Sequence, residues 1–117
     1  MAFKFENLKV WEKAVDLSAE IAETVKRFPK DEMFVLTSQI RRAADSVSLN
    51  IAEGSTGQSD AEFRKFLGYS LRSAIEVVGC IFLAKRRSLL TSEQFDFYYL
   101  KLTELIKGIQ ALRNSLK

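Results

Sequence analysis

The chain has 117 residues with one proline, five glycines, one cysteine and no histidine, and its formal net charge is +3. One domain is the usual content of this length, so we expect residues 1–117 to form a single domain. Without histidine, the chain lacks the commonest general base and the Glu-x-x-His metal motif of helical bundles. We therefore expect no enzymatic activity, no metal site and no cofactor.

Two further features bear on the compartment. Charges interrupt every apolar stretch well before the roughly 20 residues that a membrane span requires. The first residues lack the cationic and apolar regions of a secretory signal, and a single cysteine, Cys80, cannot form an intrachain disulfide. The expectation is a cytoplasmic protein with no membrane partner.

Helix-breaking residues divide the first half of the chain into two helices. The first helix is expected over residues 8–27, because Pro29 disfavours helical structure in the residue before it. The second is expected over residues 31–53, with Asp31 as its N-cap. Gly54 then follows the helix and is well placed to adopt the left-handed conformation that often ends a helix.

The second half of the chain carries two sequence signatures of a helix start. These capping boxes are Ser59 with Glu62 and Thr91 with Gln94. They predict a third helix over residues 60–87 and a fourth over residues 92–116. Long helices joined by short links favour antiparallel neighbours. The sequence therefore predicts an all-α protein that folds as an antiparallel up-and-down four-helix bundle.

The first and third predicted helices carry more apolar surface than one bundle needs. Their apolar residues cover about half of the helix circumference, whereas an ordinary surface helix has a stripe of roughly 100°. Gly68 and Gly79 fall on one line of the third helix, and such glycines often mark close approach of another element. We expect self-association. The alternative is that one or both helices lie unusually deep in a monomer.

Polar side chains line one edge of the second predicted helix. They are Gln39, Ser46, Asn50 and Glu53, with Arg42 close beside them. A buried polar group without a partner costs about 1–3 kcal/mol. We call this row the polar seam. It is either a network that fixes helix register or subunit pairing, or a row of solvent-exposed side chains at the edge of the bundle.

Basic residues are frequent on the third predicted helix. Residues 59–87 contain six basic and three acidic side chains. Repeated in an oligomer, such a surface binds phosphates; the alternative is a face that only confers solubility. The candidate nucleic-acid contacts are Arg41, Arg64, Lys65, Arg72, Arg86 and Arg87. Arg41 is also placed to form an i, i+4 ion pair with Asp45.

Three segments resemble a known protein family. They are residues 5–17 (FENLKVWEKAVDL), residues 39–44 (QIRRAA) and residues 50–54 (NIAEG). At this spacing they resemble the bacterial four-helix proteins encoded in intervening sequences of 23S rRNA genes. The resemblance implies a bundle that assembles as a homopentamer. It also implies a distant similarity to the accessory variability protein of diversity-generating retroelements, which engages a reverse transcriptase and nucleic acid.

Two functions remain open from the sequence. The first is an oligomeric accessory protein that binds RNA or DNA. The alternative is a scaffold that presents exposed apolar residues such as Phe34, Leu49 or Phe97 to another protein and binds no nucleic acid. An enzyme would need a deep pocket that joins Glu53 to a second acid.

Overall fold

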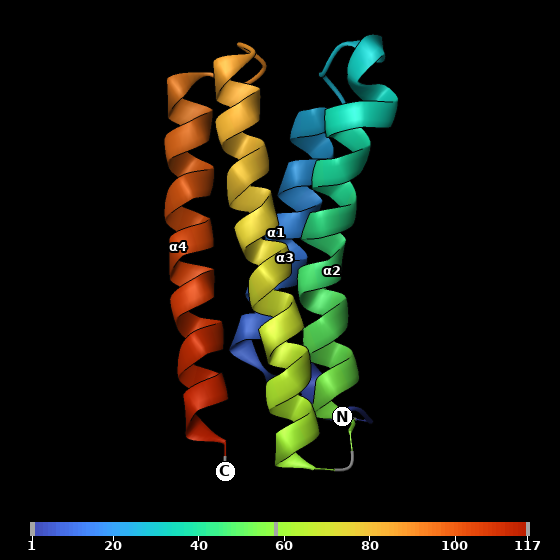
Figure 1. Ribbon diagram of the computed structural model, residues 1–117, viewed down its shortest axis with the longest axis vertical. Coiled ribbons are helices and arrows are strands. Elements are labelled where there is room, and N and C mark those ends of the chain that lie inside the picture. Colours follow the sequence, from blue (N-terminus) through green and yellow to red (C-terminus); the bar gives the residue numbers. More distant parts are fainter. Residues whose placement is uncertain (1, 58, 117) are drawn as a thin grey trace.

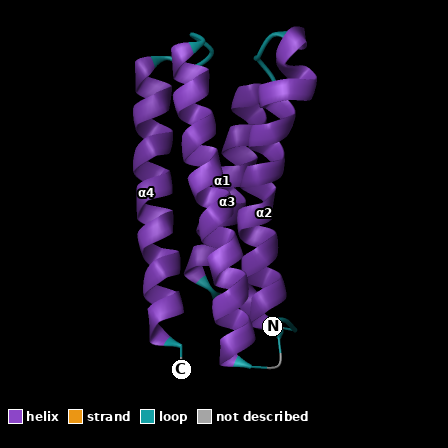
Figure 2. Cartoon of the chain, in the orientation of Figure 1, coloured by secondary structure: helices purple, strands orange, loops and turns teal. Residues whose placement is uncertain are grey.

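The computed structural model describes residues 2–57 and 59–116. Within these ranges all regular structure is helical (Figure 2). Four α-helices form the bundle: α1 (Lys9–Val25), α2 (Ser38–Ser55), α3 (Asp60–Arg86) and α4 (Ser92–Ser115). Consecutive helices run in opposite directions, and α3 lies between α2 and α4 (Figure 1). The all-α expectation is confirmed.

The connection between α1 and α2 differs from the expected single helix. A short 3-10 helix, η2 (Lys30–Glu32), and one π-helical turn, η3 (Met33–Thr37), precede α2. Asp31 lies inside η2, so its prediction as an N-cap is wrong. Pro29 occupies that position instead, with φ −58° and ψ 154°. The π turn places Leu36 in the core and leaves Phe34 88% exposed.

Gly54 has a different role from the one its position suggested. It lies inside α2, is buried, and does not have a positive φ. A Cβ atom at this position would lie 2.5 Å from Cβ of Phe66 on α3. The left-handed conformation was therefore the wrong prediction. The glycine instead allows the two helices to approach closely.

The capping hydrogen bonds expected at the starts of α3 and α4 are present. Ser59 Oγ accepts a bond from the backbone N–H of Glu62, with 3.1 Å between the heavy atoms. At α4 the box is reciprocal: Thr91 Oγ1 accepts from the Gln94 N–H, and Gln94 Oε1 accepts from the Thr91 N–H. These bonds satisfy backbone donors that have no partner within the helix.

The core is a single apolar cluster to which all four helices contribute. Helix α3 supplies the longest row of buried residues: Phe63, Leu67, Ser70, Leu71, Ala74, Val77, Cys80, Ile81 and Ala84. In the described part of the chain, α3 is also the one helix long and apolar enough to cross a membrane by length and composition alone. The buried row accounts for part of that composition, and exposed apolar residues such as Ile75 and Phe82 account for the rest.

The exposed apolar side chains lie only partly on the helices that the sequence indicated. Helix α3 exposes Ile75 and Phe82, as expected. On α1 the large apolar side chains mostly pack against the core, and Val15 is 37% exposed. Helix α4, whose apolar stripe is narrower in the sequence, exposes Tyr99 and Leu100. The surplus is therefore centred on the outer side of α3 and α4.

Replacement of Gly54 and of Gly79 with alanine, one at a time, should distinguish the effect of a close helix contact from the effect of helix propensity. Gly54→Ala should lower the free energy of unfolding by about 1–3 kcal/mol, because the new methyl group overlaps Phe66. Gly79→Ala should leave it unchanged or raise it by up to about 1 kcal/mol, since no atom lies within 4 Å of the added Cβ. Urea unfolding at one protein concentration measures both. Equal effects would contradict the close contact at residue 54.

Candidate nucleic-acid interface

The predicted polar seam forms part of the contact between α2 and α3. Ser46 Oγ accepts hydrogen bonds from Ser73 Oγ at 2.8 Å and from Asn50 Nδ2 at 2.9 Å. Farther along α3, the fully buried Ser70 donates to the backbone carbonyl of Val47 at 2.8 Å. These bonds satisfy polar groups between the helices and fix their register. They lie within one subunit.

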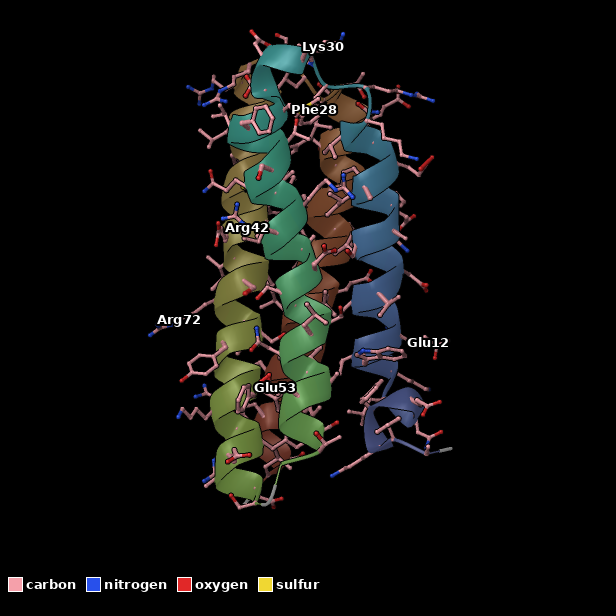
Figure 3. The ribbon with its side chains drawn as sticks, turned by 90° about the vertical axis from the view of Figure 1, so that its right-hand side faces the viewer. Glu12, Phe28, Lys30, Arg42, Glu53 and Arg72 are labelled. Atoms are coloured by element: carbon pink, nitrogen blue, oxygen red, sulfur yellow. The ribbon has the colours of Figure 1, made fainter. Side chains whose placement is uncertain are left out.

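The other members of the seam lie at the surface. Gln39 Nε2 donates to Glu76 on α3 at 3.3 Å, and Arg42 donates to Ser38 within its own helix. Arg42 and Glu53 lie toward opposite ends of α2, and Glu53 is exposed (Figure 3). Only the middle of the predicted seam is thus an internal network.

Asp45 forms a contact other than the predicted ion pair with Arg41. Its carboxylate accepts a hydrogen bond from the hydroxyl of Ser18 on α1. The structure contains no Arg41–Asp45 pair, so that prediction is wrong. Asp45 instead links α1 to α2, an interaction that local helix spacing cannot indicate.

Three basic side chains gather on the outer surface of α3 beside the end of α4. Lys65 and Arg72 come from α3, and Arg113 comes from α4. They line a hollow of about 420 Å³ together with Gly68, Tyr69, Leu71 and Ile75. Arg72 extends away from the bundle (Figure 3). No acidic residue lines the hollow, and the ion pairs in the described part of the chain are Lys26–Glu23 and Arg87–Glu32.

Arg113 is held in place by α3. Its Nε donates to the backbone carbonyl of Arg64 at 3.2 Å. A Cβ at residue 68 would lie 3.4 Å from the guanidinium, an ordinary van der Waals distance, so Arg113 packs against α3 at this residue. Arg113 could not be predicted as part of the site, because nothing in the sequence gives the register of the fourth helix against the third.

The remaining predicted contacts lie elsewhere. Arg86 is exposed near the far end of α3, about 20 Å along the axis from Arg72 at 1.5 Å per residue. Arg87 donates to Glu32 at 3.0 Å and is therefore partly neutralised. Arg41 lines a separate hollow at the start of α2, near Phe28 and Lys30. The structure thus brings Lys65 and Arg72 to one hollow, beside which Arg64 is placed through its backbone carbonyl, and leaves the other three apart.

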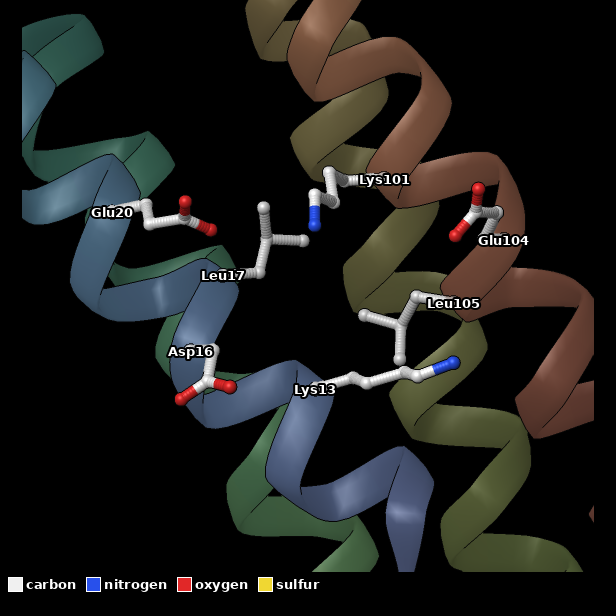
Figure 4. A pocket seen from close by; sticks show the side chains of 7 residues that line it. All are labelled: Lys13, Asp16, Leu17, Glu20, Lys101, Glu104 and Leu105. Carbon is white, nitrogen blue, oxygen red and sulfur yellow. The ribbon is translucent and has the colours of Figure 1, made fainter.

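Carboxylates gather between α1 and α4, not around Glu53. Asp16, Glu20 and Glu104 line a small hollow there of about 90 Å³ (Figure 4). Two lysines share it, Lys13 and Lys101, above a floor of Leu17 and Leu105. The three carboxylates outnumber the two lysines by one, so this hollow mixes both signs of charge. Glu53 lies on α2 and takes no part in it.

Cys80 is buried among apolar residues of α3, with 2% of its surface exposed. Burial, with a smaller contribution from the negative charge of Glu76, raises the pKa of the thiol to about 11. A thiol is reactive as its thiolate. Near neutral pH this side chain therefore serves as a small core residue.

These features define an elongated four-helix bundle with a polar network inside and an unpaired basic hollow outside. The chain belongs to the 23S rRNA-intervening sequence protein family, whose model matches residues 6–111. The fold is also similar to a crystal structure of a protein of unknown function from the S23 ribosomal protein family of Bacteroides thetaiotaomicron. That chain is 27% identical, the TM-score is 0.83, and the match covers 90% of this chain and 95% of the other. No curated protein matches the sequence. The family resemblance of the sequence motifs is confirmed.

Proposed function

We propose that this protein is a self-assembling, non-enzymatic accessory protein that binds nucleic acid through the hollow lined by Lys65, Arg72 and Arg113. The observation that carries the proposal is the gathering of three cations without a carboxylate partner. Cations in such a position bind phosphates and release counterions as they do so. The family description refers to 23S rRNA, which makes RNA the ligand to test first.

Self-assembly is supported by apolar residues on opposite sides of the bundle. On one side, Val15 and Leu49 line a hollow of about 460 Å³ between α1 and α2, and Leu49 is 65% exposed. On the other side, Phe82 and Tyr99 are exposed on α3 and α4. Two different faces that pair head to tail close into a ring when the rotation permits. The family resemblance implies five copies.

A ring would also strengthen weak phosphate contacts. Each subunit would present one basic hollow, and binding of one hollow raises the effective concentration of nucleic acid at the next. Modest positive charge per chain is then sufficient for useful affinity. This is the physical link between the two parts of the proposal.

Charge removal at the hollow tests nucleic-acid binding. Fluorescence anisotropy with a labelled RNA hairpin at several salt concentrations should show affinity that falls as salt rises. Combined Lys65→Gln, Arg72→Gln and Arg113→Gln should weaken binding at low salt and reduce the log–log salt slope by about 2 to 3. The matched control removes the same charge outside the hollow through Lys9→Gln, Lys13→Gln and Lys107→Gln.

The control variant should retain most of the wild-type affinity. Absence of binding by the wild-type protein at low salt would refute the nucleic-acid proposal and favour the protein scaffold. Equal losses in the two triple variants would show that only total charge matters.

The mass in solution tests self-assembly. Light scattering should give about five times the chain mass of 13.3 kDa. Leu49→Glu and Phe82→Glu should each yield monomers, because each places a charge in one of the two apolar faces. Phe34→Glu, at the exposed tip between α1 and α2, is the control and should leave the mass unchanged. A monomeric wild-type protein would contradict the proposal.

A further inference from the structure

Tyr69 lines the basic hollow and is partly open to solvent. The residue is 40% exposed. Phe66, one turn earlier on α3, contacts it edge to face, with 5.5 Å between ring centroids and an interplanar angle of 80°. Such a pair is modestly stabilising and favours this orientation of the ring. The hollow therefore contains an aromatic surface with a preferred orientation.

One cation lies over this ring, and two more line the same hollow. Lys65 Nζ lies 6.0 Å from the ring centroid, at the outer limit of a cation–π contact, on a flexible exposed side chain. Arg72 is one turn farther along α3, so Lys65 and Arg72 are roughly 10 Å apart along the axis at 1.5 Å per residue. Arg113 lies beside them, anchored through Nε to Arg64, which leaves its terminal nitrogens for a ligand.

This arrangement distinguishes between forms of nucleic acid. In a duplex the bases are stacked inside, and the protein meets mainly phosphates and sugars, so an aromatic ring contributes little. Single-strand sites combine a basic groove with aromatic side chains against which unpaired bases stack. The hollow has a size suited to a small ligand group, about 420 Å³, and an apolar side formed by Leu71 and Ile75.

We infer that the hollow takes single-stranded nucleic acid, with one unpaired base stacked on Tyr69 and the flanking phosphates held by Lys65, Arg72 and Arg113. The inference rests on the proposed nucleic-acid function. It gives the aromatic ring a role in binding, whereas phosphate binding by the cations alone would not need the ring. Lys65 leaves the ring for a phosphate when the base takes its place.

Anisotropy measurements with two probes test the inference. The first is a labelled 12-nucleotide oligouridine, which is unstructured, and the second is a 12-base-pair RNA duplex at the same salt concentration. Tyr69→Ala should weaken oligouridine binding by about five- to a hundredfold, the range for loss of one base stack. Tyr69→Phe should retain it, and neither variant should change duplex binding. Phe97→Ala, an exposed aromatic on α4 outside the hollow, should change neither probe.

The outcomes separate the inference from the function on which it rests. If Tyr69→Ala leaves oligouridine binding unchanged while the charge variants weaken both probes, the stacking role is wrong and nucleic-acid binding stands. If Tyr69→Ala weakens both probes equally, the ring supports the surface and does not read an unpaired base. If neither probe binds the wild-type protein at low salt, both proposals are wrong.

Discussion

The contact between α2 and α3 determines which residues the outer surface presents. Gly54 allows α2 to approach Phe66 near one end of the pair, and Ser46 bonds to Ser73 farther along. These two points fix the rotation of α3 about its own axis. Successive helical residues are about 100° apart, so the rotation that directs Ser73 toward α2 directs Arg72 outward. The basic hollow is thus a consequence of an internal contact.

The basic side chains fall into two groups, those that stabilise the fold and those that are free to bind a ligand. Where cations serve the fold they are paired or bonded: Arg87 joins α3 to η2 through Glu32, and Arg113 Nε bonds to the Arg64 carbonyl. Lys65 and Arg72, by contrast, have no carboxylate within 4 Å in the described part of the chain. Like charges that gather without partners repel one another, and the repulsion is relieved when a phosphate binds. Stability alone gives no reason for this gathering.

Much of the fold could be predicted from local sequence signals. Capping residues marked the starts of α3 and α4, and the polar positions of α2 indicated a seam whose centre, at Ser46 and Asn50, is hydrogen bonded. Features that depend on a neighbouring helix could not be predicted. The close approach at Gly54 requires knowledge of Phe66 on α3, and the position of Arg113 requires the register of α4. A sequence shows how each helix is patterned but not how two helices are rotated against each other.

Photo-crosslinking shows which residue of the hollow touches a base. The probe is an oligouridine that contains 5-iodouridine, irradiated with the wild-type protein at low salt and digested with trypsin. Cleavage after Lys65 and Arg72 isolates residues 66–72 in one peptide. We expect mass spectrometry to find the crosslinked nucleotide on Tyr69 in that peptide. Crosslinks confined to residues 31–41, at the separate hollow that Arg41 lines, would contradict this expectation.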